Sequence, residues 1–239
     1  MTTRNPKQDG SDLFDCVPQI GPCPMNCAEC FYNRPGAFYV PIDKPSIPLP
    51  EEVRNGIVRM NCGHDSNVQR DLVIKTAQMY KHFFFNTSIP RLDFPGPVVL
   101  TANPHEEESF IIPGQCLVSK DYGFDNLMFV RLRVSSTNLH LVHDASRAWT
   151  EIEVPIVLTF MAYYSHRPSK PELYEWKKRH INSYYCPTQN FIRGTWASVQ
   201  SSSLKPRLVT ICGTLKSNYC KDCHNCDSYY WQTVKRIER

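Results

Sequence analysis

The feature that most constrains the fold is a series of short apolar segments with helical patterns between some of them. The apolar segments lie at residues 13–18, 56–60, 83–87, 97–101, 126–134 and 155–161. Helical spacing of apolar residues occurs at 68–82, with Asn67 as its N-cap, and at 139–150. Strands that are apolar on both faces and alternate with helices are typical of a parallel sheet covered by helices. The sequence therefore predicts an α/β fold.

The ends of the predicted strands carry polar or special residues that could form a site. They lie at 61–63, 86–88, 101–103, 135–136 and 161–163. In parallel α/β folds, ligands bind at the carboxyl ends of the strands. Polar residues also follow strands in ordinary loops, so this pattern alone leaves both interpretations open.

Eleven cysteines are the outlying number in the composition, and most of them are clustered. Four lie between Cys16 and Cys30, and four between Cys212 and Cys226. Clustering, an odd total and a polar N-terminus without the apolar core of a signal peptide favour metal sites over disulfides. No apolar stretch reaches the roughly 20 residues that a membrane-spanning helix needs, so we expect a cytoplasmic protein and no membrane. The net charge of +4 is too weak to indicate nucleic-acid binding.

The first cysteine cluster contains Cys23, Cys27 and Cys30 in the spacing C-x3-C-x2-C. Three thiolates on one tight loop can bind three irons of a four-iron four-sulfur cubane and leave the fourth iron open. Structural zinc needs four ligands, which usually come as two separated pairs. The spacing therefore favours an iron–sulfur cluster.

This triplet follows a first short strand and precedes a series of strands and helices, and in this it resembles the radical SAM superfamily. The resemblance covers residues 12–164 as architecture, with Glu29 where the family usually has an aromatic residue. It implies a partial (β/α)6 barrel in which the open iron chelates the amino and carboxylate groups of S-adenosylmethionine. It also implies that one electron, from a donor such as flavodoxin or ferredoxin, cleaves this cofactor. The resulting 5′-deoxyadenosyl radical then takes a hydrogen atom from a substrate.

The same resemblance implies residues that bind S-adenosylmethionine. Gly63 and Asp65 would lie in the turn after the second strand, which contacts the methionine amino group in the family. The ends of later strands supply candidates for the ribose and the carboxylate: Thr101, Asn103, Arg133 and Ser135. Each of them could equally be an ordinary loop or capping residue. Cys62 and Cys116 are expected to be buried as small apolar groups.

The second cysteine cluster contains Cys220, Cys223 and Cys226 in the C-x2-C-x2-C spacing of a bacterial ferredoxin loop. Cys212 can supply a fourth thiolate, with Cys186 in reserve. Four thiolates would hold a closed second four-iron four-sulfur cluster, and radical SAM enzymes often carry such an auxiliary cluster. Structural zinc on the same residues is the alternative, because all-cysteine zinc sites tolerate varied loop lengths.

The chain is accordingly expected to divide into a disordered tail (1–11), a radical SAM-like barrel (12–164) and a small cysteine-rich appendage (165–239). The appendage is predicted to begin with a helix at 167–179. The expected function is that of a radical SAM enzyme acting on an unidentified substrate, small or compact because no further recognition domain is evident. A zinc-binding nucleic-acid or interaction module without catalysis is the main alternative. A non-catalytic iron–sulfur electron carrier is a third.

Overall fold

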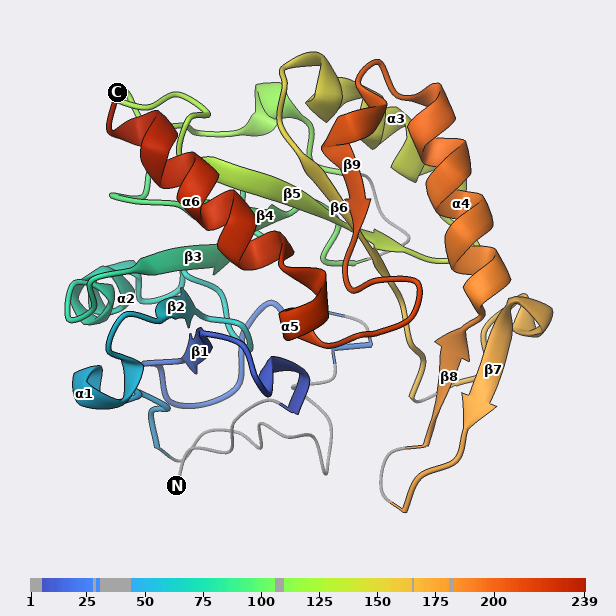
Figure 1. The fold of residues 1–239 in the computed structure, drawn as a ribbon, viewed down its shortest axis with the longest axis horizontal. Coiled ribbons are helices and arrows are strands. Elements are labelled where there is room, and N and C mark those ends of the chain that lie inside the picture. Colours follow the sequence, from blue (N-terminus) through green and yellow to red (C-terminus); the bar gives the residue numbers. More distant parts are fainter. Residues whose placement is uncertain (1–5, 28, 31–43, 106–109, 165, 181–182) are drawn as a thin grey trace.

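The computed structural model describes residues 6–27, 29–30, 44–105, 110–164, 166–180 and 183–239. Within these ranges, an open sheet of seven strands forms the centre of the molecule (Figure 1). Its strands, in sheet order, are β1 (Leu13–Cys16), β2 (Ile57–Met60), β3 (Phe83–Thr87), β4 (Val98–Thr101), β5 (Leu127–Val134), β6 (Ile156–Phe160) and β9 (Val209–Ile211). All neighbouring pairs are parallel, and β1 and β9 lie at the two edges. The prediction of an α/β fold is therefore confirmed.

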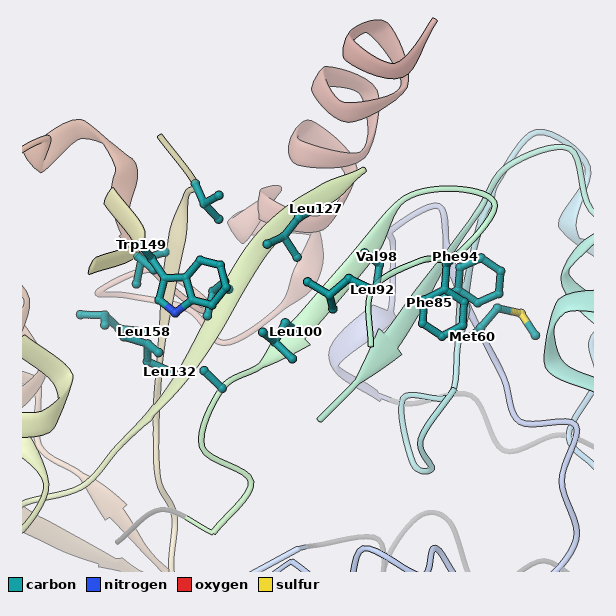
Figure 2. Close-up of a cluster of buried hydrophobic side chains, with 14 of the residues drawn as sticks. Met60, Phe85, Leu92, Phe94, Val98, Leu100, Leu127, Leu132, Trp149 and Leu158 are labelled. Atoms are coloured by element: carbon teal, nitrogen blue, oxygen red, sulfur yellow. The ribbon is translucent and has the colours of Figure 1, made fainter. Parts of the chain in front are cut away.

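Three helices contribute to the apolar core on one face of this sheet. They are α2 (Arg70–Ala77), α3 (Leu139–Glu151) and α4 (Gln189–Ser202). Val73 of α2, Trp149 of α3 and Val199 of α4 are all buried in this core. Figure 2 shows part of it, in which the rings of Phe85 and Phe94 stack with their centroids 4.5 Å apart. The short helix α1 (Pro50–Val53) precedes β2.

The opposite face of the sheet is covered by the C-terminal helix α6 (Asn225–Ile237), which crosses the strands in Figure 1. Tyr230 of α6 is buried against a second apolar cluster, whose strand residues alternate with those of the first core. These strand residues include Leu13, Ile57, Phe84, Val99, Phe129 and Val157. The guanidinium of Arg236 donates hydrogen bonds to the backbone oxygens of Asp125 and Leu127, at 2.8 and 2.7 Å. These bonds hold the end of α6 at the start of β5.

The C-terminal part of the chain is joined to the sheet in two ways. Its strand β9 pairs with β6, and its helix α6 packs on the sheet. It also contains the antiparallel pair of β7 (Tyr174–Lys177) and β8 (Tyr184–Pro187), and the short helix α5 (Cys220–Cys223) before α6. Residues 166–239 therefore supply structure to the central sheet as well as beside it.

The helix predicted at 167–179 is wrong. Pro171 lies in the middle of that segment and begins a short 3-10 turn, which leads directly into β7. Trp176 of β7 then pairs with Tyr185 of β8, with ring centroids 4.7 Å apart. Aromatic cross-strand pairs of this kind stabilise a two-stranded sheet, whereas an internal proline disrupts a helix.

Helix α2 is shorter than the predicted 68–82, and its N-cap is Gln69 rather than Asn67. The Asn67 side chain donates a 2.8 Å hydrogen bond to the Thr87 hydroxyl and accepts a 2.7 Å bond from Arg70. Asn67 therefore ties the start of α2 to the end of β3 instead of capping the helix.

Two further segments differ from the sequence-based expectations. Helix α4 lies in a stretch for which the sequence predicts no helix; the Thr188 hydroxyl caps it by accepting a hydrogen bond from the Phe191 amide at 3.2 Å. In the predicted N-terminal tail, residues 1–5 lie outside the described ranges. Gln8 is buried and donates a hydrogen bond to the Asp15 carboxylate at 2.9 Å. None of the described helices combines the length and apolar character that crossing a bilayer requires.

Candidate functional site

Cys23, Cys27 and Cys30, here called the first cysteine set, lie in the loop after β1 and line a cavity of about 110 Å³. Much of the remaining wall comes from the ends of β3 and β4, from the turns after β2 and β3, and from one residue within β5. These residues are Asn61, Cys62, Gly63, His64, Asp65, Asn86, Thr87, Ser88, Thr101 and Arg131. The cavity therefore lies at the carboxyl edge of the sheet, where parallel α/β folds bind ligands. Of the candidates named from sequence, the structure brings Gly63, Asp65 and Thr101 together with the three thiols.

Burial affects the protonation of the first cysteine set. It raises the pKa of Cys23 to about 11, and it also raises the pKa of Cys27, although the nearby Arg133 guanidinium opposes that second shift. Without a metal, these two thiols are therefore neutral at pH 7. Because iron and zinc bind thiolates, metal binding must release their protons.

Glu29 fastens the cysteine loop to a distant part of the sheet. Its backbone has a φ of 52°, in the left-handed region that glutamate rarely adopts, and its carboxylate is buried. The carboxylate accepts a 3.1 Å hydrogen bond from the amide of Tyr164 and lies 2.9 Å from Nδ1 of His166. Both partners follow β6. Glu29 therefore acts as a polar anchor for the cysteine loop, and the sequence did not indicate this role.

Asp65 holds the turn after β2 in place. Its carboxylate accepts hydrogen bonds from the amides of Asn67 and Ser88, at 2.9 and 2.6 Å, and from the Thr87 hydroxyl at 2.8 Å. Burial raises the pKa of Asp65, and these hydrogen bonds oppose the shift. Both carboxylate oxygens are thus already engaged by the protein itself.

Asn61, at the strand end 61–63 singled out from sequence, is a wall residue to which the sequence assigned no role. It is 1% exposed, and its φ of 58° places it in the left-handed region, which asparagine tolerates. Its Nδ2 donates a long 3.4 Å bond to the Ser66 hydroxyl, whereas its Oδ1 is buried and has no hydrogen-bond partner among the described residues. Because an unsatisfied buried acceptor is costly, this atom is suited to an N–H donor from a ligand.

The three remaining candidates from sequence do not belong to the cavity lining. The Asn103 side chain exchanges two 2.7 Å hydrogen bonds with the backbone of Arg133. The amide of Ser135 donates a 2.9 Å bond to Oδ1 of Asn138, the residue before α3. All three are buried and shape the ends of β4 and β5. The β5 side chain in the wall is Arg131, two residues before Arg133.

Cys212, Cys220, Cys223 and Cys226, here called the second cysteine set, gather between β9 and α6. The amide of Gly213 donates a 3.1 Å hydrogen bond to the Cys223 sulfur. Burial raises the pKa of Cys220 to about 11 and that of Cys226 to about 12, and the guanidinium of Arg59 opposes both shifts. Cys212 also contributes a smaller electrostatic rise to the pKa of each of the other three thiols, so the four thiols are near neighbours.

Two cysteines outside these sets have different surroundings. The charged groups that act on Cys186 of β8 are Lys177, Glu175 and other residues outside the two sets, so the structure does not bring this reserve ligand to the second cysteine set. Cys62 is partly exposed rather than buried as expected, and it lines the cavity. Cys62 also lies close enough to Cys220 to raise the pKa of that thiol, so it lies between the two sets. Cys116 is partly exposed as well.

Two further features of the described ranges bear on metal binding, namely the spacing of possible ligands and a second hollow. No group of three or more His, Cys, Asp or Glu side chains in them has the arrangement needed to hold a metal ion. Thiolates that bind different irons of a cubane lie farther apart than thiolates that share one ion. A larger hollow of about 520 Å³ lies beside the start of α4, with Glu172, Glu175 and Phe191 in its wall, but it contains no cysteine.

The chain was also compared with known proteins. Comparisons with protein-family models, with curated proteins and with solved structures give no match.

Proposed function

We propose that this chain is a radical SAM enzyme that binds a four-iron four-sulfur cluster through the first cysteine set. The observation that carries the proposal is the meeting of Cys23, Cys27 and Cys30 at one cavity on the carboxyl edge of a parallel sheet. Three thiolates are the ligand set that leaves one iron of a cubane open. When bound, the cluster would supply the electron that breaks a carbon–sulfur bond of S-adenosylmethionine and yields the 5′-deoxyadenosyl radical.

The wall of the cavity fits the methionine part of this cofactor. The buried Oδ1 of Asn61, to which no described residue donates a hydrogen bond, would accept an N–H bond from the amino group. Asp65 would keep the turn after β2 in position through its three hydrogen bonds. Glu29 would keep the cysteine loop in register with the segment after β6.

The proposal extends to the architecture and to the second cysteine set. Strands β1 to β6 follow one another in sheet order as in a partial (β/α)6 barrel, with β9 added at the edge. The second cysteine set would hold an auxiliary four-iron four-sulfur cluster or a structural zinc. A flavodoxin or ferredoxin would deliver the electron, in the cytoplasm, where thiols stay reduced.

The test is anaerobic reconstitution with iron and sulfide, followed by S-adenosylmethionine and dithionite. We expect 5′-deoxyadenosine, and about eight irons per chain if both sets hold cubanes, or about four irons and one zinc otherwise. Cys27→Ala should lose 5′-deoxyadenosine formation and about four irons. Cys186→Ala is the matched control, because Cys186 belongs to neither set, and it should behave like the wild type. Zinc alone, with no 5′-deoxyadenosine, would overturn the proposal in favour of a zinc-binding interaction module.

A further inference from the structure

We propose that Arg131 binds a carboxylate or phosphate group of the substrate in the cavity beside the first cysteine set. This inference rests on the proposed function, because it takes that cavity to be the reaction site. It adds a chemical class for the substrate, namely a small or compact molecule that carries an anionic group.

Arg131 lines the cavity from within β5. Side chains alternate along a strand, so Arg131 lies on the same side of β5 as Phe129, the side that α6 covers. Its side chain is partly buried and lines the cavity. It donates one hydrogen bond to the Thr101 hydroxyl at 3.3 Å and one to Oδ1 of Asn86 at 3.5 Å. Both partners are neutral and both distances are long, whereas a guanidinium has five N–H donors.

The charges around the cavity favour an anion at Arg131. Arg59, which lies on the same face of the sheet, forms an ion pair with the Asp15 carboxylate at 2.7 Å. Arg131 has no such pair with any carboxylate of the described residues. The Asp65 carboxylate lies in the same cavity wall, but both of its oxygens already accept hydrogen bonds from other groups. The wall therefore presents one guanidinium that no carboxylate of the described residues neutralises, and a bound anion would stabilise it.

The cavity also suits an anion in its size and in its hydrogen-bonding groups. A cavity of about 110 Å³ has room for a carboxylate or a phosphate beside Arg131. The Thr101 hydroxyl accepts the bond from Arg131 and keeps its own proton for donation, so the two side chains can bind one anion together. Under the proposed function, the amino and carboxylate groups of S-adenosylmethionine are bound at the open iron. Arg131 is then left for a second molecule, which is the substrate.

The probe for this site is inorganic phosphate, titrated calorimetrically into the full chain at constant ionic strength. The titration is run before and after reconstitution of the clusters. Arg131→Gln should weaken phosphate binding by about tenfold or more, because it removes charge-assisted hydrogen bonds. Arg131→Lys should keep part of the affinity, and Thr101→Val should lose several-fold. Arg193→Gln, an exposed arginine on α4, is the matched control and should bind phosphate like the wild type.

Wild-type affinity in both Arg131→Gln and Thr101→Val would overturn the anion site. If Arg131→Gln fails to fold, Arg131→Lys and Thr101→Val decide the matter alone. A second titration in saturating S-adenosylmethionine identifies the source of the anion. Phosphate that still binds supports the substrate, whereas displacement by S-adenosylmethionine assigns Arg131 to the cofactor's carboxylate and overturns the substrate assignment. Since phosphate binding needs no 5′-deoxyadenosine, loss of the proposed function and loss of the anion site are distinguishable.

Discussion

Glu29 shows how one side chain can determine the stability of the cysteine loop. It lies between Cys27 and Cys30, yet its carboxylate bonds to Tyr164 and His166, which are remote in sequence. A buried carboxylate with two such partners fixes the loop more strictly than apolar packing does, because its bonds are directional. The rare left-handed backbone of Glu29 is kept by these contacts.

Replacing Glu29 should therefore loosen the iron–sulfur cluster that we propose for the first cysteine set. We expect Glu29→Ala to release iron from the first cysteine set to a chelator about tenfold faster, since a charge-assisted hydrogen bond is lost. Glu29→Gln keeps an acceptor for the Tyr164 amide and should lie between Glu29→Ala and the wild type. The rate is followed by the visible absorbance of the cluster, and the metal content of the second cysteine set serves as the internal control. Iron release at the wild-type rate in Glu29→Ala would contradict this role.

Cys16, the last residue of β1, provides a prediction about pH. Burial raises the pKa of this fully buried thiol to about 12, from a usual value of 9.0. Between these values the folded chain keeps a proton that the unfolded chain has lost, so stability falls as pH rises through this range. Cys16→Ala should reduce this fall by about 1 kcal/mol per pH unit between roughly pH 9 and 11. Urea unfolding of both proteins across that range measures the difference, and equal slopes would rule out the buried neutral thiol.

Arg131 and Asn61 show what spacing in the sequence does not decide. The first cysteine set is predictable because its three thiols lie in one short loop. Arg131 and Arg133 are two residues apart on β5 and face the same side of the sheet. Only packing decides that Arg131 lines the cavity, whereas Arg133 donates to the backbone oxygen of Pro104. The sequence places Asn61 at a strand end, but the unsatisfied state of its buried oxygen depends on packing.

Helix α6 takes a place that its own sequence does not reveal. The strands are predictable from local patterns, because apolar residues occur on both of their faces. Helix α6 packs on one of these faces, although it lies at the other end of the chain from β1. Within α6, Tyr230 packs on the sheet, whereas Trp231 is 42% exposed. Contacts between remote segments of this kind are absent from any local pattern.

Tyr230 should accordingly contribute much of the attachment of α6. Its side chain is 4% exposed, so we expect Tyr230→Ala to lower the free energy of unfolding by about 3 to 5 kcal/mol. Tyr230→Phe should cost less, about 1 to 2 kcal/mol, because it removes only the hydroxyl, which makes a 3.4 Å contact with Nδ1 of His82 and a hydrogen bond with the backbone of Phe83. Denaturant unfolding measures both variants. A Tyr230→Ala protein as stable as Tyr230→Phe would mean that the ring is not part of the core.

The two cysteine sets lie close together although about 180 residues separate them in sequence. Cys62 lines the cavity of the first set and acts on Cys220 of the second, and Arg131 lies near both the cavity and Cys226. The carboxyl edge of the sheet and the start of α6 thus form one continuous region. The C-terminal cysteines therefore border the cavity of the first cysteine set.

This arrangement couples metal binding at the second cysteine set to the docking of α6. Cys220 and Cys223 lie in α5, Cys226 in the first turn of α6, and Cys212 follows β9. A metal that binds only the folded chain stabilises the segments that carry its ligands, whether it is an iron–sulfur cluster or zinc. Removing it should therefore weaken the link between β9 and α6 first.

Hydrogen exchange after chelation provides the measurement. Amide protection in 220–230 should fall by a factor of ten or more. Protection of α3, on the opposite face of the sheet, should change little. Cys223→Ala should reproduce the loss without a chelator, whereas Cys27→Ala, which affects the first cysteine set, should leave 220–230 protected. Equal protection before and after chelation would mean that apolar packing alone holds α6, and that the second cysteine set plays no part in folding.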